Sequence, residues 1–181
     1  MSNRALILLH SGFEEIEAVT PIDLLSRAGV EVVQAALDDT LLVSGRSGIT
    51  LQATHRLADV ADETFDAIIL PGGPGIMQIR KHPLICKLFQ QQLAVDRLIG
   101  CICAAPLLLL DAGLHTDLRY TCHPAAEGEL TESLAATVVQ DGSIITSRGA
   151  GTATEFALQL LSQLTDQSTA NSIADSICWT G

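Results

Sequence analysis

The sequence is poor in charged, basic and aromatic residues. Of its 181 residues, 17% are charged and 3% are aromatic, whereas soluble domains carry roughly 25% charged residues. Hydrophobic residues make up 48%, enough to build a large core, which excludes intrinsic disorder. Only 10 lysines and arginines stand against 21 aspartates and glutamates, giving a net charge of −11. Such a field repels phosphate backbones and anionic lipids, so we expect no nucleic-acid binding.

The sequence also lacks a hydrophobic run long enough for a membrane. Residues 98–110 are uncharged and largely apolar, but they contain Pro106 and fall short of the roughly 20 residues that a transmembrane helix needs. The apolar residues 5–9 are shorter than the core of a signal peptide, about 7–15 residues. We therefore expect a cytoplasmic protein without a membrane partner.

No two of the five cysteines form a C-x-x-C pair. An odd number of cysteines without this spacing favours free thiols in a reducing compartment over disulfides or structural zinc. A metal site remains an alternative hypothesis, although its spacing does not match that of structural zinc. Its ligands would be Cys101, Cys103, Cys122 and His123.

Short apolar runs alternate with segments of helical periodicity, and glycine or proline marks each change. This pattern predicts one α/β domain over residues 1–181, with a doubly wound, mainly parallel sheet and helices on both faces. Ligands of such sheets bind beyond the carboxyl ends of the strands. Ile16, Val19 and Leu24 are predicted to face the sheet. The expected strands are 4–9, 30–36, 66–70, 98–102, 137–139 and 143–146; the expected helices are 14–28, 83–95, 107–112 and 152–164, with a hairpin-like stretch over 38–55.

Cys103 lies at the end of a predicted strand, directly before a predicted helix. Nucleophiles on such sharp strand-to-helix turns need small residues two positions before and after, and Cys101 and Ala105 are small. A sulfur at a helix N-terminus is stabilised as thiolate by unpaired amides and the helix dipole. The pattern predicts a nucleophilic Cys103, whereas Cys101 is expected to pack in the core.

Gly72 and Gly73 follow another predicted strand, so a backbone amide there can point toward the neighbouring strand end. With the Ala104 amide it would form an oxyanion hole, whose donors stabilise developing charge by several kcal/mol. The same proline- and glycine-rich turn also simply ends a strand. His123, about twenty residues beyond Cys103, is a candidate partner of the sulfur, although an isolated histidine is more often packed or solvated.

Three glutamates open the first predicted helix, and their positions do not form one carboxylate cluster. Glu14 and Glu15 are interpreted as solvated residues at the helix start. A buried carboxyl near the sulfur would be protonated, because burial and like charge both raise its pKa.

Four motifs in this order and spacing resemble the DJ-1/ThiJ/PfpI superfamily, closest to its DJ-1-like deglycase and glyoxalase branch. They are GFEEIEAV at 12–19, LPGG at 70–73, CICAAP at 101–106 and TSRGAGT at 146–152. The resemblance implies a flavodoxin-like fold, a homodimer and no cofactor or metal. It assigns the reactive cysteine to Cys103, the acidic residue to Glu17, the histidine to His123 and the oxyanion amides to Gly73 and Ala104.

The same resemblance places Gly72, Arg148 and Ala150 around the pocket. It implies action on 2-oxoaldehydes such as methylglyoxal, or on early glycation adducts, as a defence against carbonyl and oxidative stress. The protease branch carries a histidine directly after the nucleophile, but this chain has Ala104, so peptidase activity is not expected. The alternative function is a non-catalytic redox sensor or stress chaperone that works through oxidation of Cys103.

Overall fold

A seven-stranded sheet forms the centre of the computed structural model, which describes residues 3–181. The strand order is β5-β2-β1-β6-β7-β9-β8. All neighbours are parallel except β8 and β9, which pair antiparallel. The doubly wound, mainly parallel sheet predicted from the sequence is therefore confirmed. Its strands are β1 (Arg4–Leu9), β2 (Glu31–Ala36), β5 (His55–Arg56), β6 (Ala67–Leu70), β7 (Leu98–Ile102), β8 (Val138–Asp141) and β9 (Ile144–Ser147).

Helices cover both faces of this sheet. Helices α1 (Glu15–Arg27) and α5 (Ala153–Leu164) pack on one face, and α2 (Leu57–Val60), α3 (Pro83–Ala94) and α4 (Leu107–Asp111) pack on the other. Consecutive side chains of a strand point to opposite faces, so Leu6 and Leu8 join one core and Ile7 and Leu9 the other. This explains why the central strands are continuously apolar rather than alternating.

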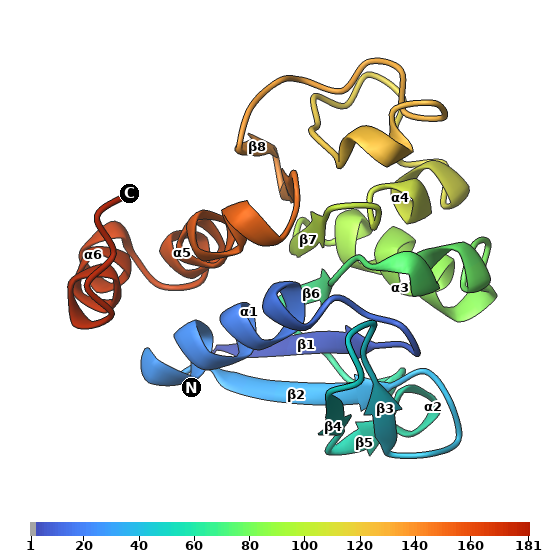
Figure 1. Ribbon diagram of the computed structural model, residues 1–181, viewed down its shortest axis with the longest axis horizontal. Helices are drawn as coiled ribbons and strands as arrows, with labels where there is room; N and C mark the ends of the chain where they lie inside the picture. The colour runs from blue at the N-terminus through green and yellow to red at the C-terminus, as the bar shows by residue number, and fades with distance from the viewer. Residues whose placement is uncertain (1–2) are drawn as a thin grey trace.

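The remaining elements lie around this three-layer body. A hairpin of β3 (Leu42–Ser44) and β4 (Thr50–Gln52) follows β2, as the sequence predicted for residues 38–55. Helix α6 (Gln167–Ser176) packs against α5 at one end of the molecule (Figure 1). Short 3-10 helices are η1 (Pro74–Gln78), η2 (Pro124–Ala126) and η3 (Ala150–Thr152).

The side of the sheet on which successive strands are added changes at β1. The first connection leads from β1 to β2 on one side, and the chain later enters β6 on the other side of β1 (Figure 1). Open α/β sheets bind ligands near such a point, beyond the carboxyl ends of the strands. The loops after β1 and β6 meet there, where Gly75 N–H donates to Gly12 O (3.2 Å). The loop after β7 lies at the same end because β7 is parallel to β6.

The prediction for the buried face of α1 is wrong in part. Ile16 and Val19 are 53% and 42% exposed, and Leu24 packs against α5 and α6 rather than the sheet. The helix is rotated so that Glu17 and Ala18 point inward, which leaves the neighbouring apolar side chains on the surface.

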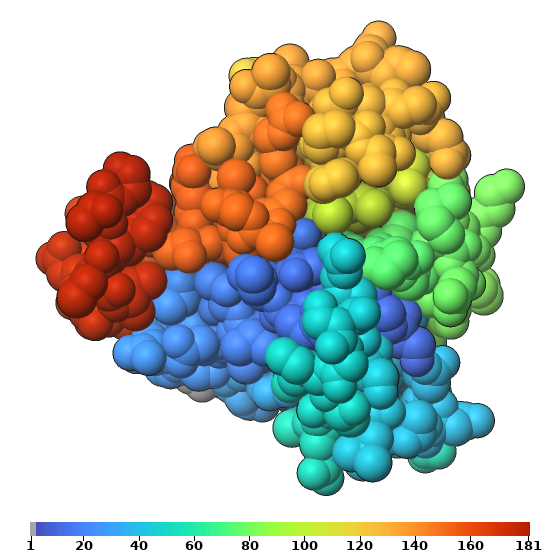
Figure 2. Space-filling model, viewed as in Figure 1, coloured from blue at the N-terminus to red at the C-terminus, as the bar shows by residue number. Residues whose placement is uncertain are grey.

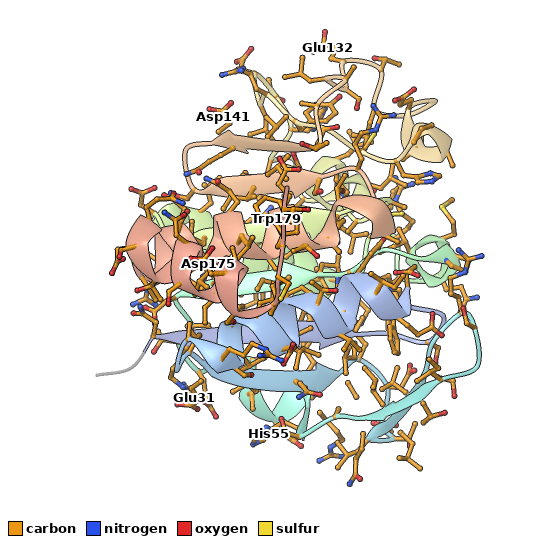
Figure 3. All side chains as sticks on the ribbon, turned by 60° about the vertical axis from the view of Figure 1, so that its left-hand side comes forward. Glu31, His55, Glu132, Asp141, Asp175 and Trp179 are labelled. Atoms are coloured by element: carbon orange, nitrogen blue, oxygen red, sulfur yellow. The ribbon has the colours of Figure 1, made fainter. Side chains whose placement is uncertain are left out.

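Several acidic side chains lie on the surface. Glu31, Glu132 and Asp175 are exposed, and Glu31 and Glu132 project from the edge of the molecule in Figure 3. None of the helices between residues 3 and 181 combines the length and the hydrophobicity of a membrane span.

Candidate active site

Cys103 occupies a strained turn directly after β7. Its φ is +65°, a conformation that costs a non-glycine residue roughly 1–3 kcal/mol. Two hydrogen bonds hold the turn: Cys103 N–H donates to Ser147 O (2.9 Å), and His123 N–H donates to Cys103 O (2.9 Å). A Cβ at Gly72 would stand 2.6 Å from the Cys103 Cβ, so the turn requires a glycine there. The sharp turn predicted from the small residues around Cys103 is confirmed.

Glu17 reaches the sulfur from the first turn of α1. The side chain is 1% exposed, and its Oε2 accepts a hydrogen bond from Gly72 N–H (2.8 Å). The carboxyl group also hydrogen-bonds with Cys103. The Glu14 side chain caps the helix by accepting from Glu17 N–H (2.9 Å), which stabilises the first turn that carries Glu17.

The two acidic groups of this pair have raised pKa values. Burial raises the pKa of Glu17 to about 7, although the Gly72 amide and Cys103 lower it. The sequence predicted a buried, protonated carboxyl with a raised pKa; burial and the raised pKa are confirmed, but a pKa of about 7 leaves the group only partly protonated at neutral pH. Burial and the adjacent Glu17 charge raise the pKa of Cys103 to about 12, against the lowering effect of the Gly73 and Ala104 amides. A second negative charge in this site is costly, so the pair retains at least one proton at neutral pH.

The prediction of a sulfur ionised by a helix N-terminus is wrong. Helix α4 begins only at Leu107, with Pro106 at its N-cap position, so the first-turn amides lie beyond the turn that holds Cys103. Ala104 supplies one amide to the sulfur, but the helix dipole weakens beyond the terminal turn. Burial and the Glu17 charge raise the pKa of this thiol and outweigh the Gly73 and Ala104 amides.

The glycine loop after β6 brings a second amide to the sulfur. Gly73 has a φ of +107°, and a Cβ there would lie 2.5 Å from Gly12 O, so no other residue fits. Glu14 N–H donates to Gly72 O (3.0 Å). The amide of the same peptide group, Gly73 N–H, faces Cys103 together with the amide of Ala104. Both predicted oxyanion donors therefore lie close to the sulfur.

His123 lies at the same site but is not hydrogen-bonded to the sulfur through its ring. Its Nδ1 accepts from Ala125 N–H (3.1 Å), which requires a neutral ring to carry its proton on Nε2. A Cβ at Gly149 would stand 3.4 Å from His123 Cδ2 and 3.7 Å from Glu17 Oε1. The histidine and the carboxyl group therefore face each other across Gly149.

A cavity of about 340 Å³ opens onto these groups. Of the predicted pocket residues, Ala150 lies in its wall. Gly72 contacts Glu17 and Cys103 but does not line the cavity. Arg148 does not line it either, and its guanidinium lies 3.7 Å from the Glu127 carboxylate. The wall consists of Glu14, Glu17, Arg46, Gly73, Pro74, Met77, Cys103, Ala104, Leu107, His123, Ala125, Ala126 and Ala150.

Arg46 is a wall residue that the sequence did not reveal. Its hairpin is anchored to the β1–α1 loop, where Arg46 N–H donates to Phe13 O (2.8 Å) and Gly12 N–H donates to Ser44 O (2.8 Å). The positive charge of Arg46 lowers the pKa of Glu17. No local pattern marks this role, because it depends on how the hairpin folds back across the sheet.

The hairpin also corrects the prediction for Glu15. This residue is 7% exposed rather than solvated, and its Oε1 accepts from Ser47 N–H (2.7 Å). Burial would raise the pKa of Glu15, but hydrogen bonds from the backbone outweigh it and lower that pKa.

A larger hollow of about 520 Å³ lies away from this chemistry. It is bounded by residues 61–65 before β6 and by the end of α3, at the opposite ends of the strands, and no cysteine or histidine lines it. The residues of the alternative metal site are also divided: Cys101 and Cys122 pack in one core, and Cys103 packs against the other. Within residues 3–181, no group of three histidine, cysteine or acidic side chains is arranged to hold a metal ion.

Comparison with known proteins agrees with this geometry. Residues 3–163 match the DJ-1/PfpI family. The chain belongs to this family. It is 38% identical over 179 residues to the Caenorhabditis elegans protein named glutathione-independent glyoxalase DJR-1.2, covering 96% of this chain and 95% of that protein.

Solved DJ-1 structures share the whole fold. Drosophila melanogaster DJ-1beta has a TM-score of 0.95 and 34% sequence identity, with 100% of both chains covered. The oxidized form of Toxoplasma gondii DJ-1 has a TM-score of 0.94 and 32% identity, covering 99% of this chain and 100% of that one. The flavodoxin-like fold implied by the sequence resemblance is confirmed for this DJ-1/PfpI protein.

Proposed function

We propose that this DJ-1/PfpI protein is a cofactor-independent glyoxalase or deglycase that acts on 2-oxoaldehydes, with methylglyoxal as the model substrate. One observation carries the proposal: a cysteine on a strained turn shares a cavity with a buried carboxyl group and two amides. A homologue named as a glutathione-independent glyoxalase supports the same class of reaction.

The first step joins the sulfur to the aldehyde carbon of methylglyoxal. As the carbon–sulfur bond forms, Glu17 takes the thiol proton and returns it to the aldehyde oxygen, giving a hemithioacetal. A base with a pKa of about 7 is well matched to this task at neutral pH. The amides of Gly73 and Ala104, which face the sulfur, stabilise charge on the adjacent oxygen.

The second step moves a proton between the two carbons. Glu17 removes the proton from the former aldehyde carbon and delivers it to the former ketone carbon. The hydroxyl proton on the former aldehyde oxygen passes to the former ketone oxygen, which leaves a thioester of lactate. Water then cleaves the carbon–sulfur bond, and the thiol regains its proton. One carbon is oxidised and its neighbour is reduced, so methylglyoxal and water give lactate without a cofactor. In this proposal, His123 Nε2–H donates to the substrate's ketone oxygen.

The proposal is tested with purified protein, methylglyoxal and no glutathione. We expect lactate from the wild type and from Cys178→Ser, because Cys178 is exposed and far along the chain from the site. Cys103→Ser should lose at least about a thousandfold in rate, as expected when a nucleophile is removed. Equal rates in Cys103→Ser and the wild type would refute the role of Cys103.

The redox sensor is the second candidate. The solved Toxoplasma gondii relative is an oxidized form, and in this chain the Glu17 carboxyl could donate to an oxygen on Cys103, as it hydrogen-bonds with the sulfur. If the wild type shows no turnover but forms a stable Cys103 sulfinate with peroxide, the sensor is favoured over the enzyme.

We also propose a homodimer that covers the exposed face of α1. Ile16, Val19 and Ile49 are exposed, and the hairpin lies beside the beginning of α1 in Figure 2. Apolar side chains gathered in this way are typical of an interface. Sedimentation should show a dimer that Ile16→Glu converts to a monomer; a monomeric wild type would refute it.

A further inference from the structure

A buried histidine lies behind the candidate active site, outside the cavity wall. His10 follows β1 and is 1% exposed. Its Nε2 lies 3.2 Å from Pro71 O, and its Nδ1 lies 3.2 Å from Ser11 O. Burial lowers the pKa of His10 despite these carbonyl neighbours, so the ring is neutral at pH 7 and donates from one nitrogen.

The Pro71–Gly72 peptide group connects this histidine to Glu17. The peptide is trans, so its C=O and N–H point in opposite directions. Its oxygen faces His10 Nε2, and its N–H donates to Glu17 Oε2 at 2.8 Å. Rotation of this rigid group would break both contacts together.

We propose that His10 is a positioning residue for Glu17: its Nε2–H donates to Pro71 O and thereby holds the Gly72 amide on the Glu17 carboxylate. The inference rests on the proposed function, in which Glu17 moves the protons. A donor aimed at the carboxylate stabilises its charged form, so this peptide group offsets part of the effect of burial on Glu17.

The next peptide group is held differently. In Gly72–Gly73, the oxygen accepts from Glu14 N–H (3.0 Å), and the amide faces Cys103. The Pro71–Gly72 peptide group therefore contacts Glu17, and the Gly72–Gly73 peptide group faces Cys103. The first is held by the His10 side chain and the second by the Glu14 backbone amide. The side chain is the one that a substitution can remove.

Other charges near the two groups must stay constant in any test. Glu17 faces Cys103 from β7, Glu14 from its own helix and Arg46 from the hairpin, and His123 lies across Gly149. His10 faces Asp38, which accepts from the Ser11 hydroxyl (3.0 Å). Variants of His10 leave all of these groups in place.

Substitution of His10 by glutamine or asparagine distinguishes the roles of its two ring nitrogens. In His10→Gln the amide nitrogen takes the place of Nε2, whereas in His10→Asn it takes the place of Nδ1. The surface variant His55→Gln is the control, because His55 is exposed at the edge of the sheet (Figure 3). The measurement is the titration of the Glu17 carboxyl carbon by 13C NMR, with the signal assigned from the spectrum of Glu17→Gln.

We expect His10→Asn to raise the Glu17 midpoint by about one pH unit, since the carboxylate loses an oriented donor. The rate constant kcat/KM at pH 7 should fall about fivefold in parallel, because less of Glu17 is ionised. His10→Gln should restore both values, and His55→Gln should leave both unchanged. Equal midpoints in His10→Asn and the wild type, or an equal rise in His10→Asn and His10→Gln, would overturn the proposal.

The NMR titration does not depend on turnover. If the wild type forms no lactate, the proposed function fails, but the Glu17 midpoint still reports whether His10 positions the carboxylate. Amide NMR spectra of both His10 variants show whether each is folded before the titration is interpreted.

Discussion

Two shielded carboxylates in this molecule, Glu17 and Asp111, have opposite electrostatic environments. Asp111, at the end of α4, accepts hydrogen bonds from Arg80 at 2.6 and 2.7 Å and from Lys81 N–H at 2.8 Å. Burial would raise the pKa of Asp111, but Arg80 and the Lys81 amide outweigh it and lower that pKa. Glu17 has one amide and a thiol instead of a guanidinium, and its pKa rises to about 7.

The comparison distinguishes a carboxylate that stabilises the fold, Asp111, from one that is proposed to exchange protons, Glu17. Asp111 stays ionised throughout the neutral range and ties the end of α4 to the segment before α3. Glu17 gains and loses its proton near pH 7, as an acid–base group must. The two residues should therefore respond in opposite ways to neutralisation of their charge.

The largest expected effect is on activity. Glu17→Gln should lower kcat/KM for methylglyoxal by about 10³-fold, because general acid–base groups contribute 10²–10⁴-fold. Asp111→Asn should retain the wild-type value wherever the protein is folded. Lactate formation at pH 7.5 measures both. An active Glu17→Gln, or an inactive but folded Asp111→Asn, would break the distinction.

The next effect is on stability, where Asp111→Asn is expected to cause the larger loss. Asp111→Asn should lose about 3 kcal/mol of unfolding free energy at pH 7, because it leaves Arg80 without its main partner. The loss should shrink as the pH falls through the range in which Asp111 becomes protonated, since a lowered pKa stabilises only the ionised form. Urea denaturation at pH 7 and at about pH 2.5, below the usual aspartate value of 3.8, checks this. Equal stability of Asp111→Asn and the wild type at pH 7 would contradict it.

Glu17→Gln should stabilise the protein at alkaline pH. The folded-state pKa lies above the usual 4.5, at about 7, so the folded protein binds this proton more tightly than the unfolded chain. The contribution of Glu17 is thus favourable below about pH 4.5 and is lost as the pH rises through 7, at a cost of about 3 kcal/mol. Urea denaturation should show Glu17→Gln more stable than the wild type at pH 8.5 and equal to it at pH 4.5. A variant less stable at pH 8.5 would refute the raised pKa.

The smallest effect is the position of the acid limb of the pH–rate profile. For the wild type, kcat/KM should fall about tenfold per pH unit below a midpoint near 7, because the carboxylate of Glu17 is the base. Asp111→Asn should share this midpoint. An acid limb with its midpoint near pH 4.5 in the wild type would show that Glu17 titrates like a solvated carboxyl.

Much of the fold could be predicted from the sequence because the residues of each central strand form a local apolar pattern. The central strands are largely apolar runs, and the turn after each contains a glycine or proline within four residues. Their predicted ends therefore lie within one or two residues of the observed ones. Helix α6 was not predicted because its residues are mostly polar and its apolar stripe is short and partly alanine, with Ala170, Ile173 and Ala174. Its beginning carried a signal, since Asp166 caps the helix by accepting from Thr169 N–H (2.8 Å).

The site could be located from the sequence, but its electrostatics could not. The small neighbours of Cys103 and the glycines after β6 indicate a sharp turn and nearby amides. The proton balance depends on burial of Glu17 against that turn and on the late beginning of α4, which are tertiary facts. The exposure of Ile16 and Val19 likewise follows from the rotation of α1 that points Glu17 inward.

The central claim is that the Cys103 sulfur adds to the aldehyde while Glu17 moves the protons, and native mass spectrometry with methylglyoxal tests it most directly. The account predicts a transient adduct of one methylglyoxal on Cys103 in the wild type, no adduct on Cys103→Ser, and much slower formation of both the adduct and lactate in Glu17→Gln, which lacks the base for both steps. Lactate release by Glu17→Gln at the wild-type rate, or the same adduct on Cys103→Ser, would contradict it.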